Sequence, residues 1–235
     1  MPWSTSPIAS IAAHSSPAPA NGFASIVVRI GFVVVALVLW FWSQRAIARK
    51  PPPVTGAVGD RLHAWTEPLH ARLEAVPAFA TALLITSSAF IDLAGLYLLG
   101  SSIFGPTLQP FVALLIVFAL RQACQAACTL PTPPGMIWRA PGFPSLLVTY
   151  GVSNDFFFSG HTAIAVLGAI QLAHLGPPWL AWAGGAIAGF EAAAVIVLRA
   201  HYTLDVIAAF FAAWAADAWS RTLAPIVDGW LARLG

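Results

Sequence analysis

The sequence predicts an all-α, polytopic membrane protein with six transmembrane helices. Of its 235 residues, 59% are hydrophobic and only 9% are charged, and the mean hydropathy is +0.80. A water-soluble domain needs far more charge to cover its surface. Six apolar stretches also follow one another along the chain, each close to the ~20 residues with which an α-helix crosses the hydrocarbon core of a bilayer. We therefore expect an integral, multi-pass membrane protein.

The six stretches form a single membrane domain over residues 25–224. They comprise residues 25–42, 77–100, 106–127, 160–175, 179–198 and 204–223, of which the fourth is the shortest. Because lipid offers no hydrogen-bond partners to the backbone, segments of this length must be helices rather than open strands. Residues 1–24, rich in Ser, Ala and Pro, predict a disordered N-terminal tail, and residues 225–235 a C-terminal tail.

Charge and cysteine content argue against a nucleic-acid site and against a disulfide or a cysteine metal site. The formal net charge is +2, from 11 basic and 9 acidic residues that are scattered along the chain, so no basic stripe exists to bind a nucleic acid. Cys124 and Cys128 lie one helical turn apart in an apolar run. That spacing is more typical of two small core residues than of a disulfide or half of a metal site.

Two histidines stand where an apolar stretch meets a polar loop. His161 ends the run Asp-Phe-Phe-Phe-Ser-Gly-His and opens the fourth stretch, while His201 precedes Tyr-Thr-Leu-Asp-Val at the start of the sixth. Alternating crossings bring both loops to the same side of the membrane, so the two imidazoles can converge. Asp205 lies four residues after His201, about 6 Å away on a helix face, where a carboxylate can accept the imidazole N–H. The other ring nitrogen is then left basic and nucleophilic.

These side chains suffice for a two-step displacement on phosphorus. His201 would attack, Asp205 would orient it, and His161 would give a proton to the departing oxygen. Fixed guanidinium groups can neutralise the phosphoryl charge, so neither a metal nor another cofactor is required. The arginines expected on this side of the membrane are Arg121, Arg139 and Arg199.

Other interpretations of the same residues remain open. Membrane histidines can hold helices together or carry protons, as in a scaffold or a transporter. Two imidazoles and a carboxylate, here His161, His201 and Asp205, can also bind iron or zinc. Glu191, deep in the fifth stretch, could contact a lipid headgroup or make an interhelical hydrogen bond.

Aromatic residues near these motifs suggest two further roles. Trp138 or the run 156–158 could surround a quaternary ammonium group. The run Phe156-Phe157-Phe158 is also the candidate for an apolar wall that keeps water from a reacting phosphorus, and replacing Phe157 or Phe158 is expected to raise hydrolysis relative to transfer. Lipid-facing or core packing can also account for any one of these rings.

The two histidine segments resemble the signature motifs of sphingomyelin synthases and of plant phosphatidylcholine:diacylglycerol cholinephosphotransferases, within the PAP2-like lipid phosphatase and phosphotransferase superfamily. The segment from Arg121 to Thr-Leu-Pro-Thr-Pro at 129–133 is similar to another element of these proteins. The Pro-Pro-Pro at 51–53 with Asp60 resembles their proline-rich first loop more loosely.

This resemblance implies a PAP2-like helical bundle with a phosphohistidine mechanism. It assigns His201 as the nucleophile, Asp205 as its orienting acid and His161 as the general acid. The residues expected to bind the substrate or its phosphate are Arg121, Arg139, Asp155, Ser159, Arg199 and Tyr202.

Two elements of the wider phosphatase superfamily are missing. The only lysine, Lys50, lacks the arginine that a Lys-x6-Arg-Pro element would place after it, and Ala194 and Val195 stand where Ser-Arg-x5-His would begin. Arg199 instead precedes His201 as in the Arg-x-His-Tyr-Thr of the plant transferases. The departures favour the transferase branch over the phosphatases.

The expected function is transfer of a phosphocholine-type headgroup from a glycerophospholipid to a lipid alcohol, either diacylglycerol or ceramide. The partners are then membrane lipids. If water is the acceptor, the same site is that of a lipid phosphate phosphatase or a phospholipase C-like hydrolase. A non-enzymatic transporter or scaffold is the remaining alternative, and the sequence does not select the headgroup, the acceptor or the oligomeric state.

Overall fold

The computed structural model describes residues 23–49, 58–150 and 156–234, which form eight α-helices and no β-strand. This confirms the expected all-α class. The helices are α1 (Phe23–Ala48), α2 (Arg61–Trp65), α3 (Glu67–Ala75), α4 (Pro77–Phe104), α5 (Gln109–Ala127), α6 (Gly160–His174), α7 (Pro178–Val197) and α8 (Thr203–Leu231). The N-terminal tail expected over residues 1–24 lies almost wholly outside the described residues.

Four helices are long and apolar enough to cross a membrane. These segments are Ala24–Ala46 of α1, Pro77–Phe104, Gln109–Ala127 and Pro178–Val197. The other two expected spans are helical but differ. With 15 residues α6 rises only ~22 Å, and the 29-residue α8 carries four charged side chains and continues past Pro225 into the segment expected to be a tail.

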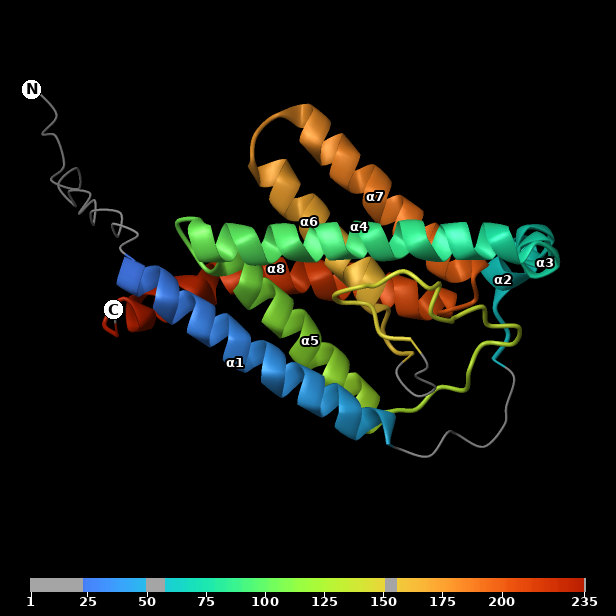
Figure 1. The fold of residues 1–235 in the computed structure, drawn as a ribbon, viewed down its shortest axis with the longest axis horizontal. Helices are drawn as coiled ribbons and strands as arrows, with labels where there is room; N and C mark the ends of the chain where they lie inside the picture. Colours follow the sequence, from blue (N-terminus) through green and yellow to red (C-terminus); the bar gives the residue numbers. More distant parts are fainter. Residues whose placement is uncertain (1–22, 50–57, 151–155, 235) are drawn as a thin grey trace, which may run out of the picture.

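The six long helices pack around one core (Figure 1). Helices α1 and α5 lie side by side, α6 and α7 form an antiparallel pair, and α8 packs mainly against α5 and α6. The start of α1 and the end of α8 lie at the same end of the bundle, as an even number of crossings requires. Helices α2 and α3 cover the opposite end, near the beginning of α4.

Small residues of α8 face the core of the bundle, and large residues of α8 face outward. Ala209, Ala213 and Ala216 recur every three to four residues and are fully buried, which lets α5 and α6 approach closely. Phe211 and Trp214 on the opposite face are 59% and 64% exposed. Apolar side chains of this size on an outer surface are stable in contact with lipid rather than water.

The loop after α5 folds back against the middle of α4. The Asp92 carboxylate of α4 accepts the backbone N–H groups of Leu146 and Leu147, both at 2.9 Å, and the Ser145 hydroxyl. Leu147 occupies space that a Cβ on Gly95 would fill. Irregular backbone is tolerated at this depth of a bundle only when its polar groups are satisfied, so Asp92 allows the loop to line the interior.

A buried carboxylate joins three helices at the other end. Asp217 of α8 accepts the side-chain amides of Gln109 from α5 and Gln171 from α6, each at 3.0 Å, and pairs with Arg221 at 2.7 Å. Asp217 therefore joins α8 to α5 and α6, and Arg221, one turn later on α8, balances its charge. Glu191, buried in α7, accepts a hydrogen bond from the Ser87 hydroxyl of α4 at 2.7 Å. Of the two roles considered for Glu191, this contact agrees with the interhelical hydrogen bond.

Candidate active site

The two histidine segments meet at one end of the bundle. His161 is the second residue of α6, and His201 lies two residues before α8 begins. The backbone N–H of Ser159 donates to the Asp205 carbonyl at 3.1 Å, which joins the start of α6 to the first turn of α8. Residues forty positions apart are thereby brought to one place.

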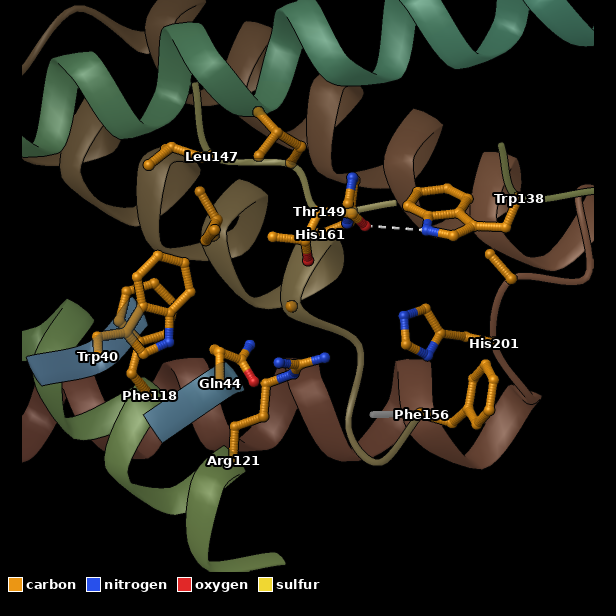
Figure 2. Close-up of a pocket in the computed structure, with 14 residues that line it drawn as sticks. Trp40, Gln44, Phe118, Arg121, Trp138, Leu147, Thr149, Phe156, His161 and His201 are labelled. Atoms are coloured by element: carbon orange, nitrogen blue, oxygen red, sulfur yellow. Dashed lines mark hydrogen bonds between the residues drawn. The ribbon is translucent and has the colours of Figure 1, made fainter. Parts of the chain in front are cut away.

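A cavity lies between these two helix starts. Its lining includes Trp40 and Gln44 of α1, Phe118 and Arg121 of α5, Trp138, Leu147 and Thr149 of the folded-back loop, and Phe156, His161 and His201. In Figure 2, His201, Phe156 and Trp138 lie at one side of the cavity, Trp40 and Phe118 lie at the other, and Arg121 points between them. The cavity therefore combines two imidazoles and a guanidinium with aromatic walls.

Asp205 holds the ring of His201 from behind. The Nδ1 atom of His201 lies 3.5 Å from Oδ2 of Asp205, and the same oxygen accepts the backbone N–H of Tyr202 at 2.8 Å. The contact to Nδ1 is longer than an ordinary hydrogen bond, as is common in catalytic pairs before substrate binds. Since the carboxylate is on the Nδ1 side, Nε2 is the nitrogen left for a ligand.

His161 presents an unpaired nitrogen to the cavity. Its Nε2 atom is buried and has no hydrogen-bond partner among the described residues. The indole of Trp138 packs edge-on against its ring, with centroids 5.1 Å apart and planes at 84°, and so limits its rotation. A buried polar atom without a partner costs free energy unless a ligand satisfies it.

Arg121 is the cation of the cavity. Its side chain is buried, and Nε donates to the carbonyl of Phe158 at 2.8 Å, which directs the guanidinium toward the start of α6. A Cβ at position 160 would lie 3.5 Å from this Nε, so the first residue of α6 runs close beside the Arg121 side chain. A guanidinium held in this way is suited to bind phosphoryl oxygens.

The other two expected arginines lie outside the cavity. Arg139 donates to the Thr81 hydroxyl of α4 at 2.8 Å. Arg199 pairs with Glu67 of α3 and donates to the Pro134 carbonyl at 2.9 Å. Both side chains are long enough to reach several partners, and the structure engages them in holding loops rather than in lining the site.

Ser159 and Tyr202 also do not line the cavity. The Ser159 hydroxyl accepts the backbone N–H of Thr162 at 3.3 Å and so caps α6. The Tyr202 hydroxyl donates to the Pro131 carbonyl at 3.0 Å. These residues therefore shape the two helix starts that carry the histidines. Asp155, the remaining expected ligand, lies outside the described residues.

Sequence reasoning missed a clamp between α2 and the start of α8. The Asp60 carboxylate accepts the Thr203 N–H at 2.6 Å and the Thr203 hydroxyl at 2.7 Å, and it also caps α2. His63, which follows in α2, bonds through Nε2 to the carbonyl of His201 at 3.0 Å. The clamp fixes the backbone on both sides of Tyr202. The only signal in the sequence is Asp60, and its distant partners cannot be read from it.

Of the run 156–158, Phe156 is the ring that faces the cavity. It lies edge-on to His201, with centroids 6.4 Å apart and planes at 76°. Phe158 is buried in the core, and Phe157 packs against it. Of the three rings considered for an apolar wall, Phe156 therefore lies at the cavity, whereas Phe157 and Phe158, the two chosen for replacement, pack in the core.

The third interpretation, a metal site, would need a cluster of ligand side chains, and the described part of the chain contains none. No three His, Cys, Asp or Glu side chains there lie close enough together to hold an ion. The Asp205 carboxylate is fully buried on the far side of the His201 ring rather than facing the cavity.

A protein-family model described as AtPDCT1/2 matches residues 60–222, a segment that begins at Asp60 and includes both histidine motifs. A comparison with curated proteins finds no match.

The Asp60 clamp predicts an acid-dependent loss of stability. Burial alone would raise the pKa of this carboxyl above 3.8, but the hydrogen bonds from Thr203 and His63 and the nearby His63 ring hold the pKa lower. A carboxyl with a lowered pKa stabilises the fold above its unfolded-state pKa and loses that effect as the pH falls through its folded-state pKa. Asp60→Asn should therefore cost about 1–3 kcal/mol at neutral pH, and its deficit against wild type should shrink at acidic pH.

Thermal unfolding in detergent between pH 3 and pH 8 measures this difference. Thr203→Val, which removes only one of the bonds, should cost less than Asp60→Asn. A deficit for Asp60→Asn that stays constant to pH 3 would contradict the assignment.

Proposed function

The chain belongs to the AtPDCT1/2 family of plant-type phosphatidylcholine:diacylglycerol cholinephosphotransferases, and from this we propose that it transfers phosphocholine from a glycerophospholipid to a lipid alcohol. The observation that carries the proposal is the cavity in which His161, His201 and Arg121 meet. We infer six membrane crossings for the chain, with α6 and α8 as the fourth and sixth.

In the first step, Nε2 of His201 attacks the phosphorus of the donor. The bond between phosphorus and the glycerol oxygen breaks, and His161 gives its proton to that oxygen, so that diacylglycerol leaves and phosphocholine remains bound to His201. The position of Asp205 supports this role, because a carboxylate 3.5 Å from Nδ1 favours the proton on that nitrogen and would stabilise the ring as it gains positive charge.

In the second step, the hydroxyl of the acceptor lipid attacks the phosphorus of the intermediate. His161, now neutral, takes the hydroxyl proton, and the bond to His201 breaks. A new phospholipid leaves and both histidines return to their starting states. His161 suits both steps, because its buried Nε2 has no hydrogen-bond partner among the described residues.

Arg121 would stabilise the charge on the phosphoryl oxygens during both steps. Because the guanidinium is already directed by the Phe158 carbonyl, little reorganisation is needed when the transition state forms. The trimethylammonium group of choline would lie against the aromatic side chains that pack beside the two histidines. Trp138 and Phe156 line the cavity there, and their ring faces attract a cation.

One assay separates headgroup transfer from hydrolysis and from a non-enzymatic role. Membranes containing the protein are given choline-labelled phosphatidylcholine with and without diacylglycerol or ceramide. A labelled new phospholipid identifies a transferase and its acceptor, free phosphocholine identifies a hydrolase, and no labelled product identifies a transporter or scaffold.

His201→Ala and His161→Ala should each lower turnover roughly 10³-fold or more, because each removes a group that bonds to or protonates the reacting atoms. Asp205→Ala should cost less, since its carboxylate orients His201 without touching phosphorus. His174→Ala, at the opposite end of α6, is the matched control and should retain activity. Full activity of the His201 variant would exclude the mechanism.

The intermediate should be a covalent adduct on His201 that forms without a metal. EDTA should leave the rate unchanged, and quenching with labelled donor should trap an adduct that is labile in acid and stable in base. Mass spectrometry of the quenched protein locates it. Chelator inhibition that zinc or iron reverses would instead favour a metal site.

Phe156 should control which acceptor reaches the intermediate. Phe156→Ser opens the wall beside His201 to water, so the ratio of free phosphocholine to new phospholipid should rise several-fold. Phe157→Ser is the comparison, because that ring packs on Phe158 instead of lining the cavity. If both products of Phe156→Ser fall together with an unchanged ratio, the ring has only a structural role.

A further inference from the structure

A second hollow lies between α1 and α5, on the outside of the bundle. Its lining includes Ala36, Leu39 and Trp42 of α1 and Leu115, Ala119 and Gln122 of α5. Leu39 and Trp42 are 61% and 70% exposed, so the hollow opens on the apolar outer surface. We refer to it below as the α1–α5 groove.

The α1–α5 groove and the histidine cavity share one wall. Trp40 and Phe118 line both, and their rings stack with centroids 4.4 Å apart and planes at 9°. Figure 2 shows this pair at the end of the cavity away from His201. The two stacked rings therefore form a wall that the cavity and the groove have in common.

One polar side chain in the groove lacks a partner. Both the oxygen and the nitrogen of the Gln122 amide are buried and make no hydrogen bond within the described part of the chain. Gln122 follows Arg121 directly and lies one helical turn after Phe118. Leaving a buried amide unpaired is costly, which indicates that a ligand satisfies it.

We propose that the α1–α5 groove binds an acyl chain of the lipid substrate and that the Gln122 amide hydrogen-bonds the ester carbonyl at the top of that chain. The inference rests on the proposed function and extends it to recognition of the lipid body. A diacyl glycerolipid carries an ester group between its phosphate and each chain. Arg121 and Gln122, adjacent on α5, can therefore hold the phosphate and the ester of one molecule at once.

Entry would occur by separation of the stacked pair. Trp40 and Phe118 move apart, and the chain remains in contact with lipid along α1 while the headgroup enters the cavity. The donor and a diacylglycerol acceptor share the same glyceride body, so either can use the groove. Separate Michaelis constants for the donor and for diacylglycerol distinguish the two.

Gln122→Leu tests the ester contact, because it removes the amide while keeping a similar volume. We expect the KM for diester phosphatidylcholine to rise about 5–10-fold, as loss of one hydrogen bond predicts. The KM for a dialkyl ether analogue, which has no carbonyl, should not change. Thermal stability should stay equal or increase, since an unpaired buried amide is lost. Equal effects on both donors, no effect on either, or a lower melting temperature would overturn the assignment.

Filling the groove with a large side chain tests whether the acyl chain binds there. Ala119→Trp should lower the ratio of long-chain to dihexanoyl donor cleavage at least about tenfold, because short chains need less of the groove. The control is Ala188→Trp, which fills a different apolar hollow between α6, α7 and α8 and should leave that ratio unchanged. The opposite pattern would assign the chain to the second hollow.

Photolabelling detects an acyl chain in the groove without requiring catalysis. The His201→Ala variant in vesicles containing phosphatidylcholine with a mid-chain diazirine should label peptides of α1 and α5, and Ala119→Trp should abolish this labelling. Labelling without any transferase activity of the wild-type protein would remove the proposed reaction but keep the lipid site. Transferase activity with labels only on α6, α7 and α8 would remove the groove but keep the reaction.

Discussion

The candidate site depends on the burial of Asp205. Its backbone carbonyl accepts the Ser159 N–H from the start of α6, and its carboxylate accepts the Tyr202 N–H and faces the ring of His201. The side chain has no exposed surface. A buried carboxylate is stable there only with hydrogen-bond donors beside it, and the Tyr202 N–H supplies one to Oδ2. The bonds to the Asp205 carbonyl and to Oδ2 therefore link the two helix starts and keep a carboxylate beside the His201 ring.

Other polar side chains position the rest of the cavity in a comparable way. Asp92 holds the loop that supplies Trp138, and Asp60 and His63 hold the backbone next to His201. In each case a side chain from one element satisfies backbone groups of a segment distant in the sequence. Irregular segments can then lie among apolar helices without unpaired donors, so chemistry-bearing residues need not all lie on helices.

The sequence predicts the helices well and the loops poorly. Apolar length predicts every long helix, because it follows from composition alone, and the two helix-start motifs indicate that His161 and His201 belong together. The helix ends differ where local contacts decide them, as for α8, which continues through Pro225. Helices α2 and α3 carry no apolar stretch and were not expected.

Side-chain partners explain the remaining differences at the site. Arg139 and Arg199 have several polar neighbours to choose from, and Thr81 and Glu67 become available only once α3 and α4 are placed. Which ring of the run 156–158 faces the cavity depends on the backbone just before α6, and spacing does not determine it. The unpaired amide of Gln122 is likewise visible only when its surroundings are known.

The short length of α6 has a consequence for how the proposed reaction is supplied. Its 15 residues rise ~22 Å, less than the ~30 Å of a hydrocarbon core. If α6 is the fourth crossing, as proposed, and its far end lies at the opposite interface, its first residues and His161 would lie below the level of the headgroups. A lipid would then react without leaving its leaflet, and both substrates would arrive by diffusion in two dimensions. The quantity that sets the rate would be the mole fraction of each lipid in the membrane rather than its concentration in the bulk solution.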